Sequence, residues 1–209
     1  MLVLGLDIGT TTVCGVLWDS ETEKPVKTLS YPNPGNLKGR FPWEHMQDPK
    51  KILECVHDML DTFKRSGKPK AIGITGQMHG ILYTERKGQP VTPLYTWQDN
   101  RGAQIYDDNI SYAEYLSIKT GTEIYPGYGL STHMYNVKNN LVPGEAHKLC
   151  TIGDYVAMAL SGMELPVTDP TNAASLGGFD LIKGEFVTKY CWCFTKWRKC
   201  LCKTSTVFR

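Results

Sequence analysis

The chain opens with a short apolar segment that runs into one glycine and three threonines. Residues 2–8 are mainly aliphatic, which predicts a buried strand, and Gly9 ends that strand. A second apolar run over residues 13–18 follows after only three threonines, so the two runs are predicted to pair as a hairpin. Glycine lets backbone N–H groups converge on one point, and threonine adds hydroxyl donors. Such a bend is suited to hold a phosphate group.

Asp7 is the one charged residue inside the first predicted strand. An ionised carboxylate in a protein interior costs several kcal/mol unless it is paired or hydrated. A hydrated divalent cation would explain its position, and the simpler alternative is a threonine-rich hairpin in which Asp7 caps the turn. In the first interpretation Asp7 binds the metal, and the phosphates are bordered by Gly9, Thr10, Thr11 and Thr12.

Residues 5–12 resemble the first phosphate motif of the FGGY family of carbohydrate kinases, which are actin-like, ribonuclease-H-like ATPases. The resemblance implies an α/β fold with a mixed five-stranded sheet, helices on both faces of that sheet, and ATP and Mg²⁺ as cofactors. Chaperone ATPases and actins carry similar motifs, so the rest of the chain must decide between these families. The FGGY family places a lysine after the motif, where this chain has Cys14.

Length and composition are those of an ordinary globular protein. The 209 residues are 41% hydrophobic and 21% charged, which allows a sizeable core. The net charge of +2 gives no argument for nucleic acid or an anionic membrane. No apolar run approaches the roughly 18–20 residues of a spanning helix, and the N-terminus lacks the features of a signal peptide. We therefore expect a cytoplasmic protein that binds a small molecule, with neither nucleic acid nor membrane as a partner.

The predicted order of elements is three strands, one helix and a fourth strand. The third strand covers residues 26–31 and ends at the breaker over residues 32–35. Asp48 and Pro49 open a helix whose apolar residues recur at helical spacing. After that helix, residues 71–75 are expected to form a buried strand. This order fits an actin-like half-domain better than a strictly alternating nucleotide-binding fold.

Two polar clusters follow predicted strands. Residues 76–80 read Gly-Gln-Met-His-Gly, and residues 97–101 read Trp-Gln-Asp-Asn-Arg after a predicted hairpin. Polar groups at the strand ends of an α/β sheet are where ligands usually bind. Both clusters resemble the ketose kinases of the FGGY family. The resemblance implies a sugar pocket formed by Gln77, Met78, His79, Trp97 and Asp99 and, less directly, by Asp169.

The residue types suit a sugar. His79 and Asp99 would hold hydroxyl groups, and Trp97 would offer a ring face to the C–H side of the ligand. His79 alone could equally be a core histidine, but the flanking glycines and the second cluster favour binding. Residues 126–129 resemble the segment that closes over the sugar. Asp154 follows a glycine, as the family's catalytic base does, yet it is predicted to cap a helix.

The resemblance covers about residues 2–185, and residues 151–175 are more similar to sedoheptulose kinases than to xylulose kinases. Residues 1–186 are therefore predicted to form the sugar-binding N-terminal domain. Residues 187–209 are rich in Cys, Trp and Lys and have no helical or alternating period. A shifted reading frame near residue 186 would explain this tail. A metal site built from its four cysteines, or a basic aromatic tail at a membrane surface, are the alternatives.

In complete members of the resembled family, a second actin-like domain holds adenine, and the catalytic Asp lies beyond the point where this chain diverges. The sequence thus predicts the truncated N-terminal half of a kinase for a ketose such as sedoheptulose or xylulose. This half would have no catalytic residue of its own and negligible turnover. It would form a homodimer or associate with a missing C-terminal domain. A non-catalytic sugar-binding module is the alternative, and the two polar clusters argue against a chaperone-like ATPase.

Overall fold

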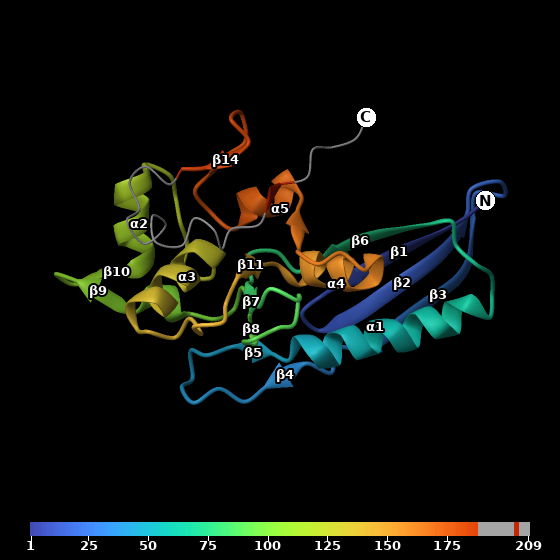
Figure 1. Cartoon of the computed structure of the whole chain (residues 1–209), viewed down its shortest axis with the longest axis horizontal. Coiled ribbons are helices and arrows are strands. Elements are labelled where there is room, and N and C mark those ends of the chain that lie inside the picture. Colours follow the sequence, from blue (N-terminus) through green and yellow to red (C-terminus); the bar gives the residue numbers. More distant parts are fainter. Residues whose placement is uncertain (188–202, 205–209) are drawn as a thin grey trace.

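The structure, a computed structural model, describes residues 1–187 and 203–204 (Figure 1). The predicted divergent tail, residues 187–209, lies almost wholly outside the described residues and stays a prediction. The strands are β1 (Leu2–Ile8), β2 (Thr12–Asp19), β3 (Lys24–Pro32), β4 (Asn36–Leu37), β5 (Met46–Gln47), β6 (Ala71–Gly76), β7 (Leu82–Thr84), β8 (Leu94–Tyr95), β9 (Ile105–Asp107), β10 (Ile110–Ser111), β11 (Lys148–Cys150), β12 (Val167–Thr168), β13 (Phe179–Asp180), β14 (Glu185–Phe186) and β15 (Lys203–Thr204). The helices are α1 (Pro49–Lys64), the 3-10 turn η1 (Arg101–Ala103), α2 (Tyr112–Thr120), α3 (Gly129–Lys138), α4 (Ile152–Ser161) and α5 (Pro170–Ser175).

A mixed sheet with the strand order β3-β2-β1-β6 forms one end of the molecule, and α2 and α3 lie at the other end (Figure 1). Strands β1 and β2 pair antiparallel with Asp7 opposite Cys14, as the hairpin prediction requires. The Gly9 N–H closes the bend by donating to the Thr12 carbonyl at 2.9 Å. Strand β6 pairs parallel with β1 and places Thr75 beside Asp7. The carboxyl ends of β1 and β6 therefore meet at one edge of the sheet.

Helix α1 forms where its sequence signals place it. The side chain of Asp48 accepts hydrogen bonds from the first-turn backbone N–H groups, and Pro49 occupies the first turn. Gly15 lets α1 approach β2, because a Cβ at that residue would lie 2.7 Å from the Phe63 ring and 2.9 Å from the Met59 sulfur. Alternate residues of β1 share one core with α1 and α4, formed among others by Leu4, Leu6, Ile8, Ile52, Val56, Met59, Phe63, Ile152, Tyr155, Val156 and Met158.

Two details of the predicted sheet need correction. Within the described residues the sheet has four strands and not five, because the chain turns away after β6 and β7 pairs with β11 in a separate sheet. Helices α1 and α4 both pack on the same face, instead of one on each face. On the opposite face Gly5, Asp7, Cys14 and Val16 line a broad, open hollow of about 510 Å³.

Strand β6 also differs from the prediction of a buried strand. Among the residues that the structure describes, β6 lies at an edge of the sheet, and its first three residues are exposed, including Ile72 at 42%. Its isoleucines and small residues indicate a strand but do not reveal that one of its edges and one of its faces are open. The burial predicted for residues 71–75 is therefore wrong, although the strand itself is confirmed.

Asp154 is a capping residue, as predicted. The N-cap of α4 is Thr151, and Asp154 stands at the third helical position, where its carboxylate accepts the Thr151 N–H at 3.0 Å. The Thr168 hydroxyl donates to the same carboxylate. Asp154 is buried, and this burial raises the pKa of its carboxyl.

Within residues 1–187 and 203–204, no helix is both long enough and apolar enough to cross a bilayer.

Candidate functional site

The predicted phosphate bend and both predicted sugar clusters meet at the hydroxyl of Thr10. Its Oγ1 donates to Gln77 Oε1 at 3.2 Å and accepts from Trp97 Nε1 at 2.9 Å. The backbone N–H of Gln77 also donates to the Ile8 carbonyl at 2.9 Å. One side chain of the bend thus contacts residues that lie 67 and 87 positions further along the chain. The structure brings these three predicted site segments together.

Two buried amides support the bend, and sequence reasoning missed both. Gln47 donates through Nε2 to the Thr10 carbonyl at 2.8 Å and accepts from Gln77 Nε2 at 2.9 Å. Asn33 donates to the Gly9 carbonyl at 2.8 Å and accepts from the Gly35 N–H at 2.9 Å. Buried amides are costly unless they are hydrogen-bonded, and these are. Neither residue belongs to a recognisable motif, so only their contacts identify them.

Asp7 is exposed on the open face of the sheet, where it lines the hollow together with Cys14 and Thr75. Thr11 and Thr12 are exposed at the bend. Among the described residues, no three His, Cys, Asp or Glu side chains gather as a ready metal site. A single exposed carboxylate nevertheless suits Mg²⁺, which keeps several waters and takes further oxygens from bound phosphates. The residues present therefore fit a hydrated Mg²⁺ and not a closed protein cage.

Met78, His79 and Trp97, three of the predicted sugar residues, are exposed or half-buried. Met78 is 53% exposed, and Trp97 of the second cluster is 48% exposed. His79 is half-buried and adopts a φ of 69°, in the left-handed region that non-glycine residues rarely occupy. Its ring stacks on Tyr128 with 4.4 Å between the centroids and an interplanar angle of 6°. The unusual backbone and the stacking set the direction of the imidazole.

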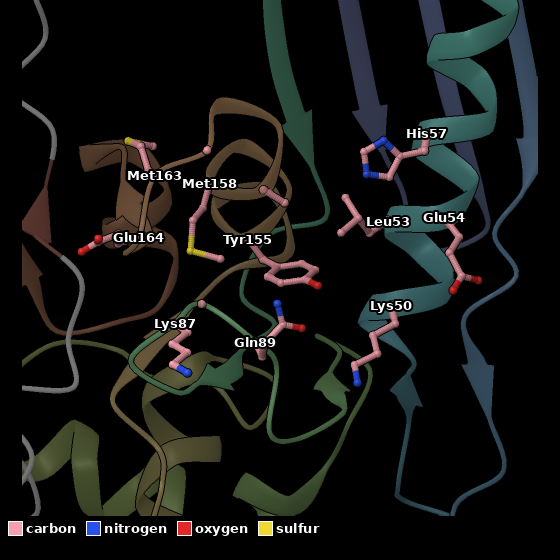
Figure 2. Close-up of a pocket in the computed structure, with 13 residues that line it drawn as sticks. Lys50, Leu53, Glu54, His57, Lys87, Gln89, Tyr155, Met158, Met163 and Glu164 are labelled. Atoms are coloured by element: carbon pink, nitrogen blue, oxygen red, sulfur yellow. The ribbon is translucent and has the colours of Figure 1, made fainter.

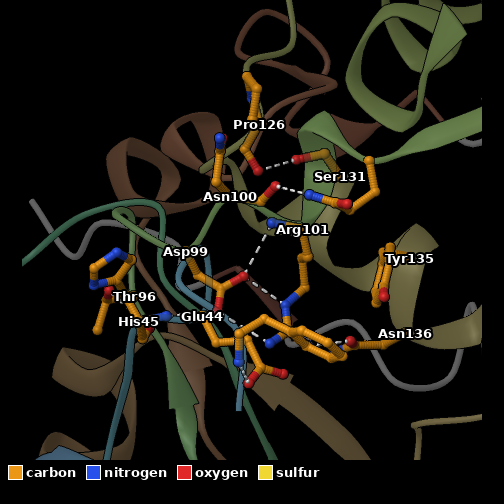
Figure 3. A network of polar contacts seen from close by, with 12 residues as sticks. Glu44, His45, Thr96, Asp99, Asn100, Arg101, Pro126, Ser131, Tyr135 and Asn136 are labelled. Atoms are coloured by element: carbon orange, nitrogen blue, oxygen red, sulfur yellow. Dashed lines mark hydrogen bonds and ion pairs between the residues drawn. The ribbon is translucent and has the colours of Figure 1, made fainter. Parts of the chain in front are cut away.

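Asp99 differs from the other members of the predicted sugar site because it is fully buried. Its Oδ1 accepts from Arg101 Nε at 2.6 Å, and its Oδ2 accepts from Arg101 Nη2 at 3.0 Å and from the His45 N–H at 3.0 Å (Figure 3). Arg101 also donates to Asn136 Oδ1 at 2.6 Å and lies 3.9 Å from the centre of the Tyr95 ring. The observed role of Asp99 is thus to neutralise a buried guanidinium, and its contact with a sugar stays a prediction.

The electrostatics of this pair follow from its burial. Burial by itself disfavours the charge of Arg101, but the hydrogen bonds and the charge of Asp99 outweigh that effect and raise the pKa of the guanidinium. An ion pair inside a protein holds only while both partners are present. Arg101 belongs to the second cluster, but its structural role could not be predicted from that motif, because Trp43 and Asn136 come from distant segments.

Asp169 is the N-cap of α5 and accepts from the Thr171 backbone N–H at 2.8 Å and from its hydroxyl at 2.6 Å. The opposite end of the same short helix reaches the predicted site, where the Ser175 hydroxyl accepts from the His79 N–H at 3.3 Å. The observed contacts of Asp169 are therefore those of a helix cap. Its predicted role in sugar binding rests on the resemblance alone.

The segment over residues 126–129 contacts both sugar clusters. Tyr128 stacks on His79, and the Gly127 backbone approaches Trp97 so closely that a Cβ at Gly127 would lie 2.0 Å from the Trp97 carbonyl oxygen. Ser131 ties the segment to α3 by donating to the Pro126 carbonyl at 2.8 Å (Figure 3). This segment was expected to close over a sugar, and it lies directly against two of the predicted sugar residues.

A separate cavity of about 460 Å³ lies between α1 and α4, away from these residues (Figure 2). Its lining includes the bases Lys50, His57 and Lys87 and the acids Glu54 and Glu164. The opposite charges offset one another, so this cavity selects for neither an anion nor a cation. It shares no residue with the predicted site.

The chain was compared with known proteins. The model of the "FGGY family of carbohydrate kinases, N-terminal domain" matches residues 2–203, which include part of the predicted tail. In an alignment of 205 positions, which covers 86% of this chain and 42% of the relative, the chain is 28% identical to sedoheptulokinase of Mus musculus. It is 32% identical to glycerol kinase of Saccharolobus islandicus (strain M.14.25 / Kamchatka #1), over 88% of this chain and 38% of that protein.

A solved structure agrees with the sequence comparisons. The ligand-bound xylulose kinase from Lactobacillus acidophilus superposes with a TM-score of 0.82 at 26% identity, over 98% of this chain and 42% of that one. The predicted fold class, an α/β domain of the actin-like ATPase type, is confirmed. The chain spans about two fifths of the length of these relatives. It belongs to the FGGY family of carbohydrate kinases and corresponds to their N-terminal domain.

Proposed function

We propose that this chain is the sugar-binding half of an ATP-dependent kinase that phosphorylates a primary hydroxyl of a ketose such as sedoheptulose or xylulose. The observation that carries the proposal is the Thr10 hydroxyl, which contacts Gln77 and Trp97. Phosphoryl transfer depends mainly on holding donor and acceptor in one geometry. A hydrogen bond between the phosphate bend and the sugar clusters serves that need. The relatives named for sedoheptulose and xylulose support the substrate class, and the glycerol kinases add glycerol as a competing candidate.

Each segment then has a role. Asp7 would hold Mg²⁺ and its waters on the open face of the sheet, and Gly9, Thr11 and Thr12 would border the phosphates of ATP. Bound ATP supplies the phosphoryl group. The sugar would lie against the exposed ring of Trp97 and the imidazole of His79. Gln77 and Met78 would form the rest of the surface that contacts the sugar.

We also propose that the chain alone does not turn over. Asp99 is paired with Arg101, and Asp169 accepts hydrogen bonds as the N-cap of α5. Neither carboxylate is therefore placed to act as a general base. A general base typically contributes a factor of about 10² to 10⁴ in rate. The relatives are more than twice as long as the part that this chain matches. We infer that their remaining part contributes to nucleotide binding. The alternative is a non-catalytic sugar-binding module.

Calorimetry tests the proposal. The chain is titrated with sedoheptulose, xylulose, ribulose and glycerol, with and without Mg-ATP, and ADP release is measured in parallel. We expect one ketose to bind, with no ADP released by the chain alone. His79→Ala should weaken that binding, whereas His57→Ala in the separate cavity should not. Binding of glycerol alone would overturn the ketose assignment, and ADP release would overturn the claim that this half is inert.

The Thr10 hydroxyl gives a sharper prediction. Thr10→Val keeps the shape of the side chain but leaves the Trp97 indole N–H and the Gln77 amide without this partner. A hydrogen bond contributes about 0.5–1.5 kcal/mol, so we expect ketose affinity to fall roughly threefold to tenfold in calorimetry. Thr11→Val is the matched control, because no hydrogen bond of its hydroxyl is present among the described residues. Equal losses in both variants would show that the Thr10 contacts are not what matters.

The open sheet face suggests how the chain associates. We propose that a C-terminal domain, or a second copy of this chain when that domain is missing, covers the face lined by Gly5, Cys14 and Val16, because apolar surface of this kind favours association. Val16→Lys should therefore shift the isolated chain toward monomer in light scattering coupled to size exclusion. Ile182→Lys, at a 97% exposed residue of another segment, should not. An unchanged profile for Val16→Lys would contradict this prediction.

A further inference from the structure

We propose that Tyr128 and Ser175 are positioning residues that hold His79 in one tautomer, with Nε2 as a hydrogen-bond acceptor aimed at a ligand hydroxyl. This inference rests on the proposed function for the identity of the ligand but not for the state of the ring. It assigns a donor–acceptor polarity to the site. A neutral polyol that offers a hydroxyl hydrogen at His79 fits that polarity, whereas a ligand that offers only an acceptor there does not.

The tautomer follows from the contact at Nδ1. Nδ1 of His79 is hydrogen-bonded to the backbone carbonyl of Ser175. A carbonyl oxygen can only accept, so Nδ1 must carry the proton, and in the neutral imidazole Nε2 then bears the lone pair. No hydrogen bond to Nε2 is found within residues 1–187 and 203–204. The second nitrogen is therefore available to a ligand.

The ring plane is fixed by Tyr128. The two rings lie parallel with centroids 4.4 Å apart, a stacking geometry that holds the imidazole from one side. Tyr128 is itself supported, edge-on by Tyr125 at 5.4 Å and by Gly177, where a Cβ would lie 3.0 Å from the Tyr128 ring. Gly177 has a φ of 92°, so glycine is favoured there for its backbone as well. Tyr128 thus holds the His79 ring, and Tyr125 and Gly177 in turn hold Tyr128.

The backbone of His79 shows that this orientation is imposed on the residue. A φ of 69° is unfavourable for a residue with a Cβ, and such a conformation persists only when the surroundings determine it. The Gly80 N–H donates to the Met78 carbonyl at 2.8 Å across His79, and the contacts with Ser175 and Tyr128 hold the residue in addition. Local strain of this kind is typical of binding and catalytic sites.

Nitrogen NMR of the free chain tests the tautomer without any sugar. Long-range ¹⁵N–¹H correlation spectra at mildly alkaline pH distinguish a protonated Nδ1 from a protonated Nε2. We expect His79 to carry its proton on Nδ1 in the wild type and in Tyr128→Phe, which keeps the stacked ring. In Tyr128→Leu we expect a mixture of the two tautomers. A proton on Nε2 in the wild type would overturn the inference, and a Tyr128→Leu spectrum like the wild type would overturn the role of Tyr128.

Ligand binding supplies the second readout. Loss of a stacked aromatic partner should lower ketose affinity about threefold to tenfold in Tyr128→Leu, while Tyr128→Phe stays within about twofold. His57→Ala, in the separate cavity between α1 and α4, is the control and should stay close to the wild type in both readouts. Equal affinity losses in Tyr128→Phe and Tyr128→Leu would assign the effect to the phenol hydroxyl and overturn the inference. A wild type that binds no sugar would contradict the proposed function, and the NMR result would still decide the tautomer.

Discussion

Replacing Asp99 with alanine should lower the free energy of unfolding by about 3–5 kcal/mol, because it leaves the Arg101 guanidinium buried without a counter-charge. Both carboxylate oxygens of Asp99 bind that guanidinium, and both side chains are at most 2% exposed. The aromatic rings around Arg101 cannot replace the lost charge. Urea unfolding followed by tryptophan fluorescence measures the change, and the thermal midpoint should fall by roughly 6–20 °C.

The control for Asp99→Ala is Asp61→Ala. Asp61 pairs with Lys64 at 2.7 Å, but both side chains are about two-thirds exposed. Exposed pairs contribute about 0–1 kcal/mol, so this variant should be nearly as stable as the wild type. If Asp99→Ala were equally stable and lost only sugar affinity, the carboxylate would serve the ligand, as the sequence motif predicted, and not the ion pair.

Gly127→Ala should lower ketose affinity roughly tenfold or more, because the added methyl group has no room. Its Cβ would lie 2.0 Å from the carbonyl oxygen and 2.9 Å from the carbonyl carbon of Trp97, and backbone atoms cannot rotate away. The segment that carries Tyr128 must then move off the second sugar cluster. Overpacking of this kind also costs about 1–3 kcal/mol in stability. Calorimetry and urea unfolding of the same samples separate the two effects.

Gly144→Ala provides the comparison for Gly127→Ala. A Cβ at Gly144 meets no atom within 4 Å, so this substitution should leave both affinity and stability close to the wild type. Wild-type affinity in Gly127→Ala would show that residues 126–129 can separate from Trp97 without harm. In that case the close approach would not be part of the binding site.

Local signals predicted the elements of the sheet well. The hairpin of β1 and β2 follows from two apolar runs around Gly9, and α1 begins at Asp48 and Pro49 because cap and first-turn chemistry act within a few residues. Asp154 was recognised as a helix cap for the same reason. These features need no knowledge of distant contacts.

Features that depend on distant contacts were not predictable. Small and apolar residues such as Gly5, Cys14 and Val16 are equally compatible with a covered and an open sheet face, so the prediction of helices on both faces was wrong. Asp99 follows a strand, as ligand-binding residues do, but it is buried together with Arg101, which lies against the rings of Trp43 and Tyr135 from other segments. Gln47 supports the bend from a two-residue strand, which is too short to carry a pattern.

In the described sheet β6 has a neighbouring strand on one side only, so its outer edge can pair with a further strand. Asp7 lies in β1, and β6 is its neighbour on that side, with Thr75 opposite Asp7. Because paired strands lie about 4.8 Å apart, a strand recruited onto β6 would run roughly 10 Å from β1. A strand from another polypeptide that paired with this edge would bring its own side chains beside the predicted phosphate bend without a change in the existing strand order.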